Sequence, residues 1–419
     1  MNRLSQGARI ALTLTVAAVT IVGSRPAHAQ AALHISSIPP SAVTANNSDA
    51  SIARTVVSVA AWGDNSYGEL GDGTTTSRSA WAPVSSLTGV TKIAAGHNHN
   101  LVVMADGTVR TWGFNGAGQL GYGYWVNSTI AKPVPGLTGV IAVAGGWLHS
   151  LAVKSDGSVW AWGDNQYGEL GDGTTNLGLT PVRVTGLTGV VKVAAGNGWS
   201  LALKSDGTVW AWGVDTYGIL GNNPHPNSLT PVQVNGLSHV TDIAAGSQHA
   251  LALETDASGQ GTVWAWGQDF VGQIGNGDTC LCSFLLPVQV PGLPSAAGIA
   301  GGDLTSVALG SDGSVWTWGA NLDGALGDGS TTSIRPSPAQ IIAAGSGIIR
   351  VAAGGNHSVA LKANGTVVGW GSNGSGELGT NPTMKHSTIV TVLRLTGVTA
   401  VAAGSADTLA IYDTPPVVK

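Results

Sequence analysis

The chain has 419 residues and a formal net charge of -5. Glycine contributes 62 residues and charged side chains only 10% of the chain, whereas average domains have about 7% glycine and about 25% charged residues. With 43% hydrophobic residues the chain can bury a large core, which excludes intrinsic disorder. The acidic balance argues against a nucleic-acid partner, because nucleic-acid binders neutralise phosphates with lysine and arginine.

The first residues have the features of a secretory signal peptide over residues 1–29. Arg3 and Arg9 flank the start of an apolar segment at 10–23, and Ala27-His28-Ala29 supplies a small-residue cleavage site. The segment is shorter than the roughly 18 apolar residues that a membrane span needs. We therefore expect a secreted, periplasmic or cell-envelope protein with no membrane span in the mature chain; an uncleaved signal anchor is the alternative.

Seven copies of one unit occupy residues 55–412. A polar leader at 30–54, which we expect to be flexible, precedes them, and a tail at 413–419 follows. Each copy contains the pattern W-G-x-[ND]-x-x-G-x-[LI]-G, and the Trp-Gly pairs recur every 50 to 54 residues. A fixed period of this length predicts a solenoid, a propeller or an array. The seven tryptophans are Trp62, Trp112, Trp162, Trp212, Trp266, Trp318 and Trp370.

The units are predicted to be β-structure. Asp-Gly or Asn-Gly pairs such as Asp156-Gly157 separate short apolar runs, which is a strong hairpin signal because the turn requires positive φ. Runs such as Leu201-Ala202-Leu203 are apolar on both faces, which suits sheets packed between neighbouring sheets. The small Ala-Ala-Gly runs are assigned to the innermost strands, where converging sheets leave little room.

The two ends of the repeat region complement each other. The segment 56–63 has the sequence of a third strand with no strands before it, and 398–411 supplies the first two strands of a unit that lacks its third. Pairing them would close a ring and remove the open sheet edges. The predicted fold is therefore an all-β, seven-bladed β-propeller closed by its N-terminal strand.

With these blocks identified, the unit resembles the repeat of the regulator of chromosome condensation family. The Ala-Ala-Gly-x-x-His-Ser-Leu-Ala-Leu and Trp-Gly-x-Asn-x-x-Gly-x-Leu-Gly blocks both match that repeat over about residues 55–412. The resemblance implies a seven-bladed propeller, although a fold does not fix a function. Members include an exchange factor for a small GTPase, a plant UV-B photoreceptor and secreted bacterial β-lactamase inhibitors, and the predicted export makes the secreted type the nearest in compartment.

A binding site must lie where the repeats differ, because residues shared by all copies serve the scaffold. The resemblance to the secreted inhibitors implies a site in the two positions after each Ala-Ala-Gly block. Tryptophans that break the repeat are further candidates, since aromatic side chains supply binding hot spots. The candidate binding residues are His97, Asn98, Trp147, Gln248, Asp303 and Asn356 after these blocks, and Trp81, Trp125 and Trp199, the last in place of the usual histidine.

The predicted function is a secreted binding or interaction module for a protein or cell-surface partner, with no catalytic residues, cofactor or metal. The sequence contains no phosphate loop, nucleophile elbow or H-E-x-x-H motif. Three alternatives stay open: an inhibitor of an extracellular enzyme such as a β-lactamase, a guanine-nucleotide-exchange-like regulator, and an enzyme with a site in the central channel.

Three further patterns have structural interpretations. His99, His149, His249 and His357 share one repeat position, which favours hydrogen-bonded core histidines over metal ligands. The Gly-Asp-Gly triplets at 71–73, 171–173 and 327–329 lack the spacing of a calcium loop and indicate turns. Cys280 and Cys282 are two residues apart, so either a strained disulfide or a free pair is expected.

Overall fold

The computed structural model describes residues 56–414 except 224–225, 279–281, 331 and 382–384. The predicted signal peptide (1–29), the leader (30–54), Cys280 and residues 415–419 of the tail lie outside the described residues. Among the residues that are described, no helix has the length and apolar character required to cross a membrane.

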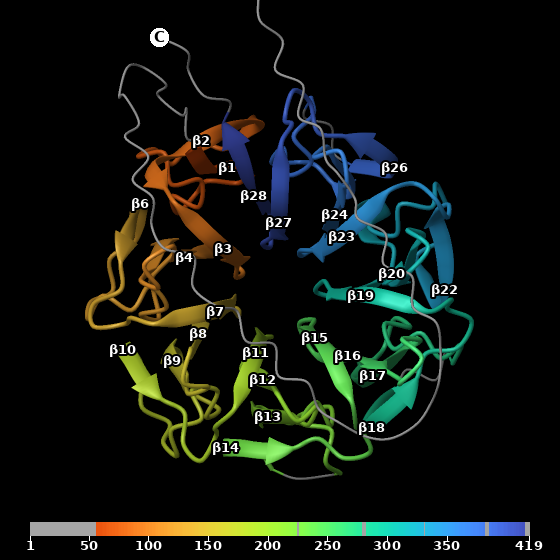
Figure 1. Cartoon of the computed structure of the whole chain (residues 1–419), viewed down its shortest axis with the longest axis horizontal. Helices are drawn as coiled ribbons and strands as arrows, with labels where there is room; N and C mark the ends of the chain where they lie inside the picture. Colours follow the sequence, from red (N-terminus) through yellow and green to blue (C-terminus); the bar gives the residue numbers. More distant parts are fainter. Residues whose placement is uncertain (1–55, 224–225, 279–281, 331, 382–384, 415–419) are drawn as a thin grey trace, which may run out of the picture. The chain divides into compact units, whose positions relative to one another are not determined.

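Seven four-stranded antiparallel sheets are arranged as blades around a central channel (Figure 1). Blades 1 to 6 follow chain order, and the closing blade combines both ends of the described chain. The strands of blades 1 to 3 are β3 (Val90–Ala95), β4 (His99–Met104), β5 (Val109–Gly113) and β6 (Ser128–Pro133); β7 (Val140–Gly145), β8 (His149–Lys154), β9 (Val159–Gly163) and β10 (Gly178–Arg183); and β11 (Val190–Ala195), β12 (Trp199–Lys204), β13 (Val209–Gly213) and β14 (Ser228–Gln233).

The remaining blades have slightly longer outer strands. Blade 5 also contains a short 3-10 turn, η1 (Leu322–Gly324). The strands of blades 4 to 6 are β15 (Val240–Ala245), β16 (His249–Thr255), β17 (Gly261–Asp269) and β18 (Cys282–Gln289); β19 (Ala296–Gly301), β20 (Thr305–Gly310), β21 (Val315–Ala320) and β22 (Ile334–Ile342); and β23 (Ile348–Ala353), β24 (His357–Lys362), β25 (Val367–Ser372) and β26 (Lys385–Thr391). The closing blade contains β27 (Val398–Ala403), β28 (Asp407–Thr414), β1 (Val56–Gly63) and β2 (Arg78–Thr88).

The closure predicted from the sequence is confirmed. Strand β1 pairs with β28 without a register shift, from Val56 opposite Thr414 to Gly63 opposite Asp407. The small Ala-Ala-Gly runs do end the innermost strands, since β3, β7, β11, β15, β19, β23 and β27 stand at the channel end of their sheets. No sheet therefore needs a partner from another molecule to complete its inner or central strands.

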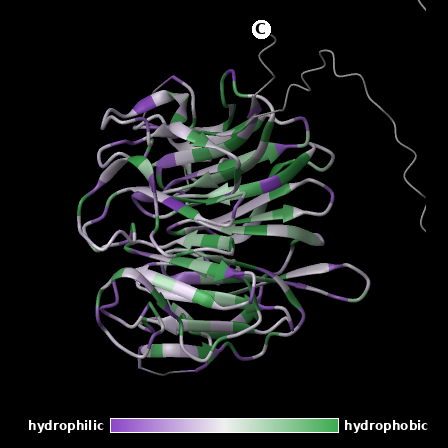
Figure 2. Cartoon of the chain, turned by 60° about the vertical axis from the view of Figure 1, so that its left-hand side comes forward, coloured by the Kyte–Doolittle hydropathy of each residue, from purple (hydrophilic) through white to green (hydrophobic). Residues whose placement is uncertain are grey.

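The repeated Trp-Gly pair is the packing unit between blades. All seven tryptophans are fully buried, and Trp162 packs with Leu101, Val109 and other residues of the preceding blade. The following glycine approaches the backbone closely: a Cβ atom on Gly163 would lie 2.4 Å from the Leu148 carbonyl oxygen. Figure 2 shows apolar residues concentrated along the strands, where blades face one another, and hydrophilic residues in the connecting turns.

The repeated histidines are core residues that join neighbouring blades. His149 Nε2 lies 2.9 Å from the Ser200 hydroxyl, which itself donates a 2.8 Å hydrogen bond to the Glu169 carbonyl oxygen. Because the hydroxyl donates its proton to that carbonyl, His149 must be the donor to the hydroxyl. Trp212 Nε1 donates to the same carbonyl at 2.8 Å. We call this His–hydroxyl–carbonyl–Trp arrangement the latch.

The same latch contains His99 with Ser150, His249 with Ser306 and His357 with Thr408. The prediction of hydrogen-bonded core histidines is therefore confirmed. At the seam between the closing blade and blade 1, Asp407 replaces the histidine and accepts a 2.8 Å hydrogen bond from Asn100 Nδ2. Burial raises the pKa of Asp407 well above its usual value.

Candidate functional site

Strand direction gives the propeller two distinct faces. The turns that follow the Ala-Ala-Gly blocks and the long loops that follow the Trp-Gly pairs lie at the same strand ends, which we call the loop face; the Asp-Gly hairpins lie at the opposite ends, the hairpin face. Hydrogen bonds join the two sets of loop-face segments. Phe114 N donates to the Asn98 carbonyl at 2.7 Å, and Asp164 N donates to the Leu148 carbonyl at 2.8 Å.

A closed circle of backbone hydrogen bonds fixes the loop-face end of the channel. Each turn donates to the corresponding turn of the next blade: His97 N to Gly146 O at 3.0 Å, Trp147 N to Gly196 O at 3.2 Å, and so on around the axis. Ser405 N of the closing blade donates to His97 O at 3.1 Å and completes the circle. Side chains carried by these turns are therefore held at defined positions around one opening.

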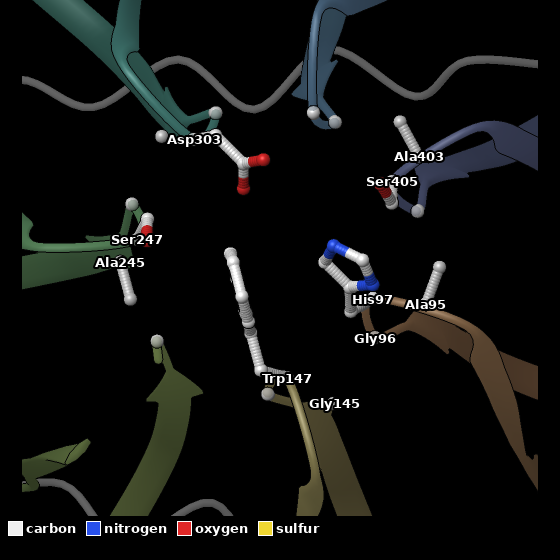
Figure 3. A pocket seen from close by; sticks show the side chains of 18 of the residues that line it. Ala95, Gly96, His97, Gly145, Trp147, Ala245, Ser247, Asp303, Ala403 and Ser405 are labelled. Atoms are coloured by element: carbon white, nitrogen blue, oxygen red, sulfur yellow. The ribbon is translucent and has the colours of Figure 1, made fainter. Parts of the chain in front are cut away.

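A small axial pocket of about 80 Å³ occupies this opening. His97, Trp147, Asp303, Ser247 and Ser405 line it from five different blades, and Figure 3 shows the imidazole, the indole and the carboxyl group directed toward the axis. The His97 and Trp147 ring centroids are 4.4 Å apart. The pocket is large enough for the tip of one side chain, and it shares Ala95, Gly145 and other small residues of the innermost strands with an adjoining channel cavity of about 240 Å³.

Burial dominates the electrostatics of the axial pocket. It raises the pKa of Asp303, while the nearby His97 and the Trp147 indole oppose that rise. Burial also lowers the pKa of His97, so its imidazole is held in the neutral form, although the Asp303 carboxylate acts in the opposite direction. Trp147 Nε1 is buried and falls short of hydrogen-bond geometry with any acceptor in the described part of the chain. The pocket therefore contains a carboxyl group, an imidazole and an indole N–H close to one another.

Five aromatic side chains, three exposed and two half-buried, lie in the long loops of the loop face. Tyr67 is 40% exposed and packs on Phe114 of the next blade at a ring-centroid distance of 4.8 Å. Tyr217 and Phe270 form a second pair at 5.3 Å, and Tyr167, 38% exposed, covers Gly198 of the following blade. We call these five residues the aromatic collar. Their apolar rings, held by neighbouring blades, provide rigid contact area for a partner.

The two faces differ strongly in charge. When each charged residue of the described chain is assigned to the nearer strand end, the loop face has fourteen acidic and three basic residues, and the hairpin face has eight acidic and ten basic residues. The loop-face acids are Asp64, Glu69, Asp72, Asp164, Glu169, Asp172, Asp215, Asp269, Asp278, Asp303, Asp323, Asp328, Glu377 and Asp407; the bases are Arg78, Arg335 and Lys385.

The hairpin face has the opposite character around the channel. A wider cavity of about 770 Å³ opens there, and Lys92, Lys192 and Arg350 occupy the same repeat position on three of its walls. Lys192 forms an ion pair with Asp242 of the next blade. The channel therefore connects an acidic, narrow end with a wide end where basic side chains predominate.

Three of the residues predicted from the sequence are brought together. His97, Trp147 and Asp303 share the axial pocket. Asn98, Gln248 and Asn356 are half-buried in the same turns but do not line the pocket. The Gln248 side chain donates from Nε2 to the Asn197 carbonyl at 3.3 Å, and the backbone carbonyls of Asn98 and Asn356 accept hydrogen bonds from the long loops.

The prediction that Trp199 is a binding residue is wrong. Its side chain is fully buried, and Nε1 donates to the Ser247 carbonyl at 2.8 Å. Trp199 fills the space of a latch histidine, because Ala250 of the next blade has no hydroxyl group to accept the usual bond. A tryptophan in this position cannot contact a partner without unfolding the blade.

The other two tryptophans lie away from the axial pocket. Trp81 is half-buried on the outer strand β2, where it packs edge-on against Tyr412 at 5.4 Å. Trp125 is 58% exposed in the loop between β5 and β6. Phe114 and Phe270 were not predicted as site residues, although each is the only aromatic residue at its position in the seven repeats.

The remaining motifs have local structural roles. In the Gly-Asp-Gly triplets, Asp72 Oδ1 accepts hydrogen bonds from the Thr74 backbone N–H and hydroxyl at 2.9 and 2.7 Å, and Asp172 does the same with Thr174, as expected of turns. Cys282 is disulfide-bonded. Within the described residues, no group of three or more metal-ligating side chains is assembled.

Comparison with known proteins identifies the repeat family and relatives of part of the chain. A family model described as RCC1-like domain matches residues 33–298, and models of the Regulator of chromosome condensation (RCC1) repeat match residues 312–361 and 348–377. The E3 ubiquitin-protein ligase HERC2 of Homo sapiens is 34% identical over 160 residues, which is 37% of this chain and 3% of that protein. Protein RCC2 homolog of Xenopus laevis is 34% identical over 129 residues, 30% of this chain and 25% of that protein.

The chain thus matches only a minor part of the length of these relatives. Among solved structures, Prp20p from Saccharomyces cerevisiae has a TM-score of 0.76 at 24% identity, covering 86% of this chain and 92% of that one. Human WBSCR16 has a TM-score of 0.76 at 23% identity, covering 85% of this chain and 100% of that one. At these identities the likeness establishes the fold alone.

Proposed function

The chain belongs to the RCC1-like domain family, and from this premise we propose that it is an exported, non-catalytic propeller whose loop face binds a protein or cell-surface partner. The carrying observation is the combination of a rigid axial pocket with an aromatic collar on one face. Interfaces are enriched in tyrosine, tryptophan and phenylalanine, and a few such anchors provide most of the binding energy.

Rigidity supports a binding role. The circle of hydrogen bonds between turns and the latches between blades hold loops from all seven blades in fixed relative positions. A preorganised surface loses little conformational entropy when it binds, so modest contact area can give useful affinity. The size of the axial pocket, which suits one inserted side chain, fits recognition of a macromolecular surface better than turnover of a small substrate.

The test is capture of a partner by the mature protein, followed by affinity measurements on face-specific variants. We expect Trp147→Ala and Tyr67→Ala to weaken binding of the captured partner by about tenfold or more, with little change in melting temperature. Ile141→Ala and Ile349→Ala are the matched controls, because both side chains are exposed aliphatic groups on the hairpin face.

Binding that is lost in the hairpin-face controls and retained in Trp147→Ala would contradict the proposal. Addition of the mature protein to purified extracellular enzymes, β-lactamases included, tests one specific form of it. Stoichiometric inhibition that depends on Trp147 would identify the protein as an enzyme inhibitor, and binding without inhibition would identify it as an adhesion or assembly module.

A further inference from the structure

We propose that the loop face recognises a basic surface of its protein partner and that the axial pocket receives one lysine or arginine side chain from that partner beside Asp303. The inference rests on the proposed function of the loop face and adds the chemistry of the partner. Three independent features carry it: the charge of the face, the groups in the pocket and the size of the pocket.

The two faces differ enough in charge for the loop face to favour a partner whose surface is positively charged. The loop face has a formal charge of -11, from three basic and fourteen acidic residues, and the hairpin face has a formal charge of +2. Burial of groups such as Asp407 reduces the effective loop-face charge without reversing its sign. Complementary potentials of this kind steer association and penalise partners of like charge.

Apart from the Trp147 indole N–H, which is a donor, the polar side chains of the pocket can accept hydrogen bonds, and the Asp303 carboxyl group favours a positively charged ligand. The Asp303 carboxyl group lines the pocket without an ion-pair partner in the described chain. The neutral His97 imidazole and the Ser247 and Ser405 hydroxyl groups can accept further hydrogen bonds from an ammonium or guanidinium group. The Trp147 ring lies on another wall, where an entering cation would also contact an aromatic surface.

The size of the axial pocket suits the tip of one side chain. A cavity of about 80 Å³ accommodates a group of a few non-hydrogen atoms. Lysine and arginine carry such a group on a long, mostly apolar stem, so the partner backbone can rest on the aromatic collar while the charged tip reaches Asp303. An acidic side chain would bring a second carboxyl group beside Asp303, and the repulsion between like charges costs free energy.

The probe is a short peptide of alternating glycine and lysine, compared with its glycine–glutamate counterpart, by titration calorimetry at low ionic strength. We expect the lysine peptide to bind and to lose affinity as salt is raised, and the glutamate peptide to show no loop-face binding. Asp303→Asn should weaken binding of the lysine peptide about tenfold. Asp206→Asn makes the same charge change on the hairpin face and should alter the affinity for that peptide less than about twofold.

Ser405→Lys provides a second variant that keeps Asp303. The new side chain supplies an internal cation to the pocket, so it should abolish peptide binding while thermal melting shows a folded protein. Equal affinity of Asp303→Asn and the parent protein, or equal binding of both peptides, would overturn the proposal. If the natural partner needs Trp147 but is not displaced by the lysine peptide, the proposed function stands and this inference fails; if the partner needs only the hairpin face, the proposed function itself fails.

Discussion

The latch histidines make the stability of the propeller depend on pH, and His149 permits a direct test. Burial lowers the pKa of His149 to about 4, against about 6.5 for an exposed histidine. Between these values the unfolded chain binds a proton that the folded protein excludes, so this residue destabilises the fold as the pH falls. From the two pKa values, the loss on going from pH 7 to pH 5 is about 2 kcal/mol of unfolding free energy.

Other groups act in the opposite direction over the same range. Burial raises the pKa values of Glu69 and Glu169 to about 7, so the folded protein takes up protons there that the unfolded chain does not. These carboxyl groups stabilise the fold as the pH falls. The pH dependence of the parent protein is therefore a balance of terms and does not isolate the histidine.

A variant comparison does isolate it. His149→Gln keeps a side-chain N–H that can donate to Ser200 Oγ but removes the titrating group. Urea unfolding at pH 7 and pH 5 should show that the parent loses about 2 kcal/mol more than the variant. His239→Asn, at an exposed site with positive φ where asparagine is tolerated, is the control for replacing a histidine outside the latches. Identical pH responses of the parent and His149→Gln would refute a neutral, buried latch histidine.

Three further outcomes are expected. Trp162→Ala should cost about 3–5 kcal/mol because it leaves a core cavity, whereas Trp147→Ala should leave urea unfolding nearly unchanged; equal losses would place Trp147 in the core. Deletion of residues 30–50 should leave the melting temperature almost unaltered, but deletion of 30–63 removes β1 and should cause aggregation or a large loss of stability; the closure would be unimportant if the two truncations behaved alike. Mass spectrometry of exported protein should find Gln30 or a close neighbour at the N-terminus, and an intact signal segment in the soluble fraction would contradict the predicted cleavage.

The fold could be predicted because repetition exposes the scaffold. Seven Trp-Gly pairs at similar spacing identified the blades, and the unmatched strands at 56–63 and 398–411 identified the closure. The axial pocket was accessible to the same reasoning, since turns at one repeat position must meet around the axis. Position in the repeat therefore predicted His97, Trp147 and Asp303 as site residues, although not their contacts.

Side-chain burial was harder to predict, because residue type alone does not reveal it. Trp199 is unusual for its repeat position, but that position faces the neighbouring blade in every copy, so any side chain there is buried. The missing hydroxyl at Ala250 was the relevant clue, since it removes the acceptor that a histidine would need. The aromatic collar depends on pairs such as Tyr217 and Phe270 that are distant in sequence, and their contact required the three-dimensional arrangement of blades.

The pairing of β1 with β28 also sets the order in which the molecule can be completed during synthesis. About 350 residues separate the two strands, and ribosomes add about 5–20 residues per second, so β1 waits roughly 20 to 70 seconds for its partner. Throughout that time the ring is open and the closing blade lacks β27 and β28, the latter being the partner of β1. Closure of the ring is therefore a late step of folding on a growing chain, because β28 is the last of the described strands to be synthesised.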